Sequence, residues 1–71
     1  MNIKLNEPIS ENLQSIVAKN LTADTINRIG RENGFQNGFA TKLFAGVINA
    51  SERNEGLILI ICKEAFKIKV D

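Results

Sequence analysis

Apolar residues recur at helical spacing in the first part of the chain. They favour a first amphipathic helix from about Pro8 to Lys19, because proline fits a first turn and Glu11 lies near the positive end of the helix dipole. The stripe that would face the core consists of Ile9, Leu13, Ile16 and Val17. The chain is therefore expected to open with a helix whose inner side is aliphatic.

A second helix is predicted after Thr22, which is a good N-cap residue. Leu21 and Ile26 are placed as the two halves of a hydrophobic staple. Gly34 stands where a helix C-terminus favours a left-handed residue, so the helix should end near Asn33. Its inward stripe is Ile26, Ile29 and Gly30.

The segment Phe35 to Gly38 is typical of a tight turn, from which Phe35 can point back into the core. A third helix should begin near its end. Its apolar positions fall on one side of a helical wheel: Phe39, Ala40, Leu43, Phe44 and Val47. The small and polar positions fall opposite: Gly38, Thr41, Lys42, Ala45 and Asn49. Gly46 either ends this helix or lies inside it, where glycine would cost about 1 kcal/mol of helix stability relative to alanine.

The C-terminal part allows two interpretations. After a polar connection over residues 49–55, in which Ser51 or Asn54 could cap the next element, the run from Leu57 to Cys62 is continuously apolar. Lysines at its end favour a buried fourth helix, namely Lys63, Lys67 and Lys69. The alternation of Phe66, Ile68 and Val70 with lysines, and of Ile3 and Leu5 with polar residues, instead suits strands. We expect an all-α bundle of three or four helices, with a winged helix carrying a small sheet as the alternative.

Length and composition restrict the classes of function. A chain of 71 residues makes one domain, residues 1–71, and 44% hydrophobic with 24% charged residues is an ordinary globular balance. Cys62 is the only cysteine and histidine is absent, which excludes an intramolecular disulfide, Cys/His zinc sets and Ser-His or Cys-His nucleophiles. The acidic residues are scattered and no phosphate-binding glycine motif is present. We expect a protein that is not an enzyme and uses no cofactor or metal.

The apolar runs and the net charge of the chain give two further expectations, about its location and about nucleic-acid binding. The longest apolar run is too short to cross a bilayer and the N-terminus lacks the apolar core of a signal peptide, so a cytoplasmic protein without a membrane partner is expected. The net charge is only +1, so binding to nucleic acid must depend on a local patch.

The segment from Thr22 to Ala45 meets the structural requirements of a helix-turn-helix. The two helices must cross closely, which a small residue such as Gly30 allows, and the turn needs a residue tolerant of positive φ, such as Gly34. With Phe35 and Leu43 filling the space between the helices, residues 25–44 resemble the helix-turn-helix of phage-repressor-type regulators. The Leu43-Phe-Ala-Gly stretch followed by Glu52-Arg-Asn is also similar to the end of that family's recognition helix and the loop after it. Asn33 and Ala40 depart from the pattern, which has an apolar and a branched aliphatic residue there.

The resemblance implies roles for the exposed polar residues. Gln36 and Asn37 would read adenine through paired donors and acceptors, Lys42 would contact guanine or phosphate, and Thr41 a phosphate or a thymine methyl. Contacts to the DNA backbone would come from Arg28, Arg31, Asn49, Ser51, Arg53 and Asn54.

These observations predict a sequence-specific DNA-binding protein, a small transcriptional regulator of bacterial or phage origin. The alternative is a non-enzymatic module that binds another protein through a helical bundle, favoured by the near-zero net charge. We expect a homodimer on double-stranded DNA, since the C-terminal segment offers more apolar surface than so small a monomer should cover. The expected dimer contacts are Leu57, Ile58, Ile61 and Phe66.

Overall fold

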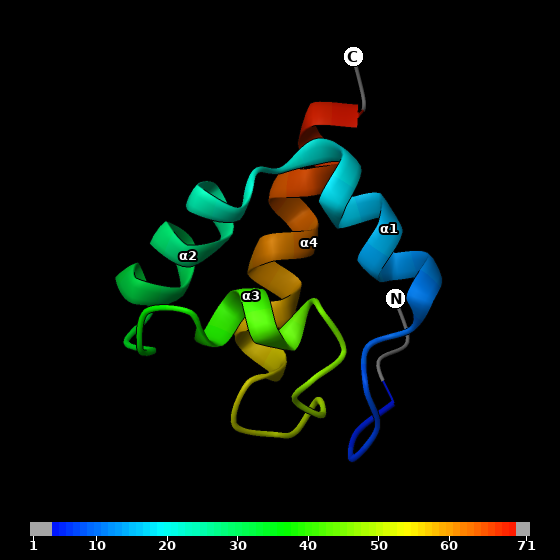
Figure 1. The fold of residues 1–71 in the computed structure, drawn as a ribbon, viewed down its shortest axis with the longest axis vertical. Coiled ribbons are helices and arrows are strands. Elements are labelled where there is room, and N and C mark those ends of the chain that lie inside the picture. The colour runs from blue at the N-terminus through cyan, green and yellow to red at the C-terminus, as the bar shows by residue number, and fades with distance from the viewer. Residues whose placement is uncertain (1–3, 70–71) are drawn as a thin grey trace.

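The protein is all-helical in its computed structural model, which describes residues 4–69. Four helices follow one another along the chain, α1 (Glu11–Asn20), α2 (Ala23–Glu32), α3 (Phe39–Leu43) and α4 (Glu55–Lys69), and no strand occurs in this range. In Figure 1, α4 runs behind the other helices, with α1 along one side of it and α2 along the other. α1 packs against α4, while α2 packs against both α3 and α4. The expected helical bundle is confirmed.

The first helix begins later than predicted. Ser10 is its N-cap and its hydroxyl oxygen accepts a hydrogen bond from the N–H of Leu13 at 3.3 Å, so Pro8 lies before the helix and not in its first turn. Ile9 is buried just ahead of the cap, and its carbonyl accepts a 2.6 Å hydrogen bond from Nε2 of Gln14. The start of α1 is therefore fixed by the serine cap and by Ile9 packing into the core.

The signals predicted for α2 are confirmed. The Thr22 hydroxyl accepts a hydrogen bond from the N–H of Thr25 at 3.2 Å. Leu21 and Ile26 are both buried in the same hydrophobic cluster, as expected for a staple. The helix ends with Asn33 as its C-cap, and Gly34 follows with φ of +88°.

The third helix is shorter than the apolar pattern suggests. α3 has five residues, and the chain then turns so that the N–H of Val47 donates to the carbonyl of Lys42 at 3.1 Å. Gly46 has φ of +80°, a left-handed conformation that a continuing helix excludes. The prediction that Val47 faces inward is wrong, because its side chain lies beyond the helix and is 72% exposed.

The C-terminal segment forms the fourth helix, so the winged-helix alternative is wrong for the described range. Residues 66–69 continue α4, which a half-buried strand cannot do. Ile3 and Val70, two of the residues in the predicted alternation, lie outside the described residues. Leu5 lies in a turn, and this N-terminal segment is held to the connection before α4 by two backbone hydrogen bonds, Asn6 N–H to Ala50 O at 2.7 Å and Ala50 N–H to Glu7 O at 2.9 Å.

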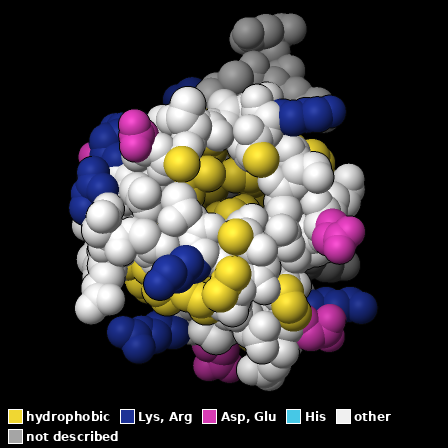
Figure 2. All heavy atoms as spheres, in the orientation of Figure 1, with side chains coloured by type: hydrophobic (Ala, Val, Ile, Leu, Met, Phe, Trp, Pro, Cys, Tyr) yellow, Lys and Arg dark blue, Asp and Glu magenta, His cyan; other side chains and the backbone are white. Residues whose placement is uncertain are grey.

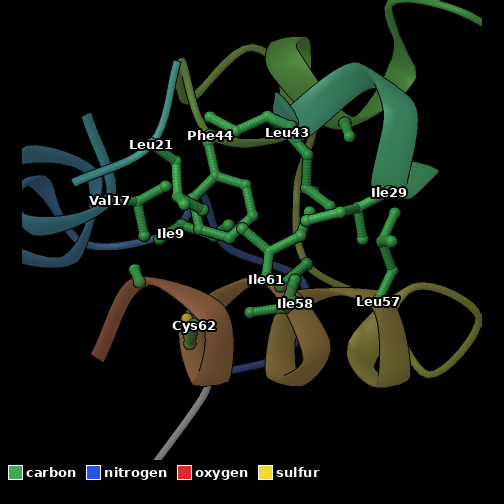
Figure 3. Close-up of a cluster of buried hydrophobic side chains, with 14 residues drawn as sticks. Ile9, Val17, Leu21, Ile29, Leu43, Phe44, Leu57, Ile58, Ile61 and Cys62 are labelled. Carbon is green, nitrogen blue, oxygen red and sulfur yellow. The ribbon is translucent and has the colours of Figure 1, made fainter. Parts of the chain in front are cut away.

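One hydrophobic core joins the four helices. Figure 3 shows α4 directing Ile61 toward Phe44 and Leu57 toward Ile29, with α1 and α2 closing the cluster from either side. Leu43, Ile58 and Ile61 are fully buried. The core therefore fixes the position of α3 and of the residues on either side of it.

Candidate nucleic-acid interface

α2 and α3 cross at Gly30 and Ala40. Ala40 is fully buried, and a Cβ atom placed on Gly30 would lie 3.0 Å from the Cβ of Ala40, closer than two such atoms normally approach. The close crossing predicted from Gly30 is thus present. It also explains the small residue at position 40, since a branched side chain there would meet the backbone of α2.

The turn after α2 is closed by a Schellman motif. The N–H of Phe35 donates to the carbonyl of Gly30 at 3.0 Å and the N–H of Gly34 donates to that of Arg31 at 3.1 Å, which satisfies the end of the helix. Asn33 is exposed, and its Nδ2 donates to the carbonyl of Ile29 at 2.8 Å. The polar residue at position 33 therefore bonds to the last turn of α2 from outside and does not disturb the core.

Asn27 joins α2 to the start of α3, a role that the sequence pattern did not reveal. Its Oδ1 accepts a hydrogen bond from the N–H of Gly38 at 3.0 Å and one from the hydroxyl of Thr41 at 3.4 Å. Asn27 lies three residues before Gly30, on the face of α2 that meets α3, and this spacing is the signal that could have found it. It sets the position of the turn relative to α2.

The predicted base-contacting residues do not all face the same way. Gln36, Asn37 and Lys42 are exposed, and we call them the α3 edge. Thr41 is half-buried, and its hydroxyl also lies 2.9 Å from the carbonyl of Gly38. Because that hydroxyl already has two protein partners, Thr41 positions the helix and is not a free donor on the α3 edge.

Arg31 controls what Asn37 can offer to a ligand. Nη1 of Arg31 donates to Oδ1 of Asn37 at 2.7 Å, so the acceptor atom of that amide is occupied. The Nδ2 group of Asn37 remains able to donate. This arrangement does not support the expected paired reading of adenine by Asn37, which needs both groups. Gln36, in contrast, is exposed, and no hydrogen bond within residues 4–69 occupies its side chain.

A groove beside the α3 edge brings together several residues predicted to contact the DNA backbone. Its volume is about 450 Å³, and Phe35 and Phe39 stack in it with ring centroids 5.0 Å apart. The turn and the connection before α4 both line it, through Gly34, Phe35, Gln36, Phe39, Ile48, Asn49, Ser51, Arg53 and Asn54. Asn49, Ser51 and Arg53, distant from Gln36 in sequence, thus lie near it in space.

Asn54 is not available for a ligand. It is only 3% exposed, its Oδ1 accepts a hydrogen bond from the N–H of Ser51 at 2.8 Å, and its Nδ2 donates to the carbonyl of Asn49 at 3.2 Å. The prediction of a DNA contact by Asn54 is wrong, because both polar groups hold the connection that leads into α4. Of its neighbours, Arg53 is exposed.

The positive charge near the α3 edge is local. Arg28, on α2, is exposed and lies 3.7 Å from the carboxylate of Glu32 one turn away, so part of its charge is balanced. Arg31, Lys42 and Arg53 are also exposed. Figure 2 shows Lys and Arg side chains along the α2 side and below α3, with Asp and Glu side chains among them, on a chain of small net charge.

A second groove, between α1 and α2, has a different character. Figure 2 shows it as a hollow with a hydrophobic floor. It is lined by Gln14, Val17, Ala18, Leu21, Thr22, Ala23, Ile26, Thr41 and Phe44. None of these described residues carries a charge, so the groove offers no cation to a phosphate.

The expected dimer contacts are wrong for three of the four residues. Leu57, Ile58 and Ile61 are 2% exposed or less because they form the core beneath α1, α2 and α3 (Figure 3). Phe66 is partly buried and packs against the same cluster. The exposed large apolar residues of α4 are instead Leu59 and Ile60.

The remaining chemistry of the described chain is sparse. Burial raises the pKa of the Cys62 thiol to about 11. Within residues 4–69, no three His, Cys, Asp or Glu side chains gather in a way that could hold a metal ion, and no helix has the length and apolarity needed to cross a membrane. Comparison with protein-family models, curated proteins and solved structures found no match.

Proposed function

We propose that this chain binds double-stranded DNA in a sequence-specific manner through the α3 edge and acts as a small transcriptional regulator of bacterial or phage origin. The observation that carries the proposal is the crossing of α2 and α3 at Gly30 and Ala40, with a glycine turn that leaves Gln36, Asn37 and Lys42 exposed. This is the arrangement by which a helix-turn-helix presents the start of its second helix to a major groove. The kinship to phage-repressor-type regulators is part of the proposal.

Because α3 is short, the proposed base contacts lie at its beginning and in the turn before it. Five residues span about 7.5 Å, so the helix can present one turn and a half to a groove. In the proposed complex Gln36 reads a base through its amide, Asn37 donates from Nδ2, and Lys42 contacts guanine or a phosphate. Few base contacts are available, so each should contribute a large part of the sequence preference.

Contacts to the DNA backbone would come from the residues around the groove and from α2. Arg53, Asn49 and Ser51 line the groove next to Gln36, and Arg31 is held beside Asn37. Arg28 is a weaker candidate because Glu32 lies close to its guanidinium. This role would place the protein in the cytoplasm, where a bacterial or phage regulator meets DNA.

A titration of fluorescently labelled mixed-sequence duplex DNA, followed by anisotropy, tests the proposal. If Arg31, Lys42 and Arg53 each replace one counterion, log K should fall with log salt concentration with a slope of about −2.7. Raising the salt from about 50 to 200 mM would then weaken binding roughly 40-fold. An absence of binding at the lower salt would contradict the proposal and favour the protein-binding alternative.

Variants assign the contacts. Lys42→Ala or Arg53→Ala should weaken binding to all sequences and reduce the salt slope by about 0.9 each. Gln36→Ala should mainly relax the preference among sequences, and Lys19→Ala, on α1, is the matched control that removes an exposed cation elsewhere. Equal loss of binding in the control and in Lys42→Ala would mean that the α3 edge is not the interface.

A further inference from the structure

The groove beside the α3 edge has an aromatic surface. Phe35 and Phe39 both line it, and their rings are nearly parallel, with 16° between the planes and 5.0 Å between the centroids. Both residues are half-buried, so each packs against the core and keeps part of its surface accessible to solvent. Accessible aromatic rings in a groove are the surface on which proteins that bind unpaired nucleotides stack a base.

The same groove carries a positive charge. Arg53 is the one charged residue among the described residues that line it, and the acidic neighbours Glu52 and Glu55 are not part of the lining. Arg53 is exposed and forms no ion pair within residues 4–69. A guanidinium presents its N–H donors in a planar arrangement that matches the oxygens of a phosphate. The groove therefore places a group suited to an anion beside the aromatic surface.

Two amide side chains of the lining can form hydrogen bonds to a ligand. Gln36 is exposed, and no hydrogen bond within residues 4–69 occupies its side chain. Asn49 is also exposed, and its Nδ2 donates to the carbonyl of Asn6 at 3.3 Å. In the described part of the chain no hydrogen bond reaches its Oδ1, which stays an acceptor. Such amides suit the polar edge of a base, which carries both donors and acceptors.

We propose that this groove binds one unpaired nucleotide, with its base against Phe35 and Phe39 and its phosphate at Arg53. The amide of Gln36 then meets the polar edge of the base. The groove volume of about 450 Å³ lies within the roughly 300–1,000 Å³ of small-molecule sites. A free nucleotide and a nucleotide within a single strand present the same base and phosphate, so both belong to this ligand class. Because the contacts are few, a free nucleotide should bind with a dissociation constant of about 1 mM.

This inference does not rest on the proposed binding of duplex DNA, although both ligands would contact Gln36 and Arg53. A base inside a duplex is paired and stacked on its neighbours, so it does not reach the two rings. The duplex titration and a nucleotide titration therefore test separate claims. If both claims hold, an excess of deoxyadenosine monophosphate (dAMP) should displace labelled duplex from the protein.

An amide chemical-shift titration of the full chain with dAMP, up to about 10 mM, tests the groove. Saturable shifts are expected at residues 34–36, 39 and 48–53. Deoxyadenosine lacks the phosphate and should bind at least about twofold more weakly, whereas inorganic phosphate lacks the base and should bind at least about fivefold more weakly. Inorganic phosphate that binds as tightly as dAMP, or no saturable shift with dAMP at these residues, would overturn the inference.

A single-stranded oligonucleotide of about six deoxyadenosines distinguishes the two sources of the nucleotide. Binding at least about tenfold tighter than that of dAMP at the same salt concentration would assign the groove to single strands, because neighbouring phosphates add contacts to the protein. Equal affinity for the two ligands would assign the groove to a free nucleotide.

Variants separate the contact to the base from the contact to the phosphate. Phe39→Leu should weaken dAMP and deoxyadenosine alike by at least about fivefold, whereas Phe39→Tyr keeps the ring and should retain wild-type affinity. Arg53→Ala should weaken dAMP about two- to fivefold and leave deoxyadenosine unchanged. Arg28→Ala is the matched control, because it removes an exposed guanidinium that does not line the groove.

Far-UV circular dichroism verifies that each variant is folded. Wild-type affinity for dAMP in Phe39→Leu, or equal effects of Arg53→Ala and Arg28→Ala, would overturn this inference and leave the duplex proposal to its own test.

Discussion

Adding one methyl group at Gly30 tests the crossing on which the α3 edge depends. In Gly30→Ala the new Cβ would lie 3.0 Å from the Cβ of Ala40, and both atoms are attached to helical backbone, so α2 and α3 would have to separate by a few tenths of an ångström. Overpacking a core site destabilises by about 1–3 kcal/mol, whereas alanine gains about 1 kcal/mol over glycine in a helix interior. The expected net loss is about 1 kcal/mol, a fall in Tm of roughly 4–8 °C.

Urea unfolding followed by far-UV circular dichroism measures this loss, and Gly56→Ala is the matched control. Gly56 is also helical, but nothing lies within 4 Å of its added Cβ, so that variant should be more stable by about 0.5 kcal/mol. In the double variant Gly30→Ala with Ala40→Gly, the two changes should couple favourably by about 1 kcal/mol, because the second relieves the first. The close crossing would be refuted if Gly30→Ala stabilised the protein as much as Gly56→Ala does. It would also be refuted if the effects of Gly30→Ala and Ala40→Gly on stability were strictly additive.

Four further predictions concern three buried or half-buried groups, Asn27, Asn54 and the Cys62 thiol. Asn27→Ala leaves the N–H of Gly38 without its acceptor and should lower the free energy of unfolding by about 1–3 kcal/mol. Asn27→Asp keeps an acceptor and should retain most of that stability, so equal losses in urea melts of the two variants would contradict this role. Asn54→Ala should lower the free energy of unfolding by about 1–3 kcal/mol because it breaks two buried hydrogen bonds. The control Arg53→Ala, at the exposed neighbouring residue, should change it by less than about 0.5 kcal/mol. Similar urea melts for the two variants would contradict a structural role for Asn54. Because burial raises the pKa of Cys62 to about 11 from the ordinary 9.0, its thiol should resist a disulfide reagent at pH 8 until urea unfolds the chain, and rapid labelling of the native protein would contradict this. The difference in unfolding free energy between the wild type and Cys62→Ala should not depend on pH below about pH 9. As the pH rises from there towards 11, the wild type should lose stability relative to the variant, because the thiol ionises in the unfolded chain before it does in the folded one.

Local signals in the sequence predicted the start and end of α2 well. Thr22 acts through a hydrogen bond three residues away, and Gly34 through its own backbone conformation, so neither depends on distant parts of the chain. The length of α3 was not fixed in this way. Gly46 is compatible with ending a helix or continuing it, and only the packed structure sets its φ at +80° and leaves Val47 exposed.

The two sides of α4 could not be distinguished from the sequence because the run from Leu57 to Cys62 is apolar throughout. Only packing against the other three helices turns Leu57, Ile58 and Ile61 inward and leaves Leu59 and Ile60 outside.

The buried roles of Asn27 and Asn54 were missed for a related reason. Polar residues are by default expected at the surface, and the partner of Asn27, Gly38, lies 11 residues along the chain and meets it only in three dimensions. The partners of Asn54, Ser51 and Asn49, are local, but its burial follows from the packing of the connection before α4. For the candidate site, the exposure of Gln36, Asn37 and Lys42 agrees with the sequence prediction, whereas their binding to DNA stays a prediction.

An amide chemical-shift titration with duplex DNA asks directly whether the α3 edge is the surface that meets DNA. The largest shifts are expected at residues 36–42, with Arg53 and its neighbours also affected and Leu59 and Ile60 on α4 nearly unchanged. Shifts concentrated on α1 or around Leu59 and Ile60, with the signals of residues 36–42 unchanged, would contradict the proposed interface.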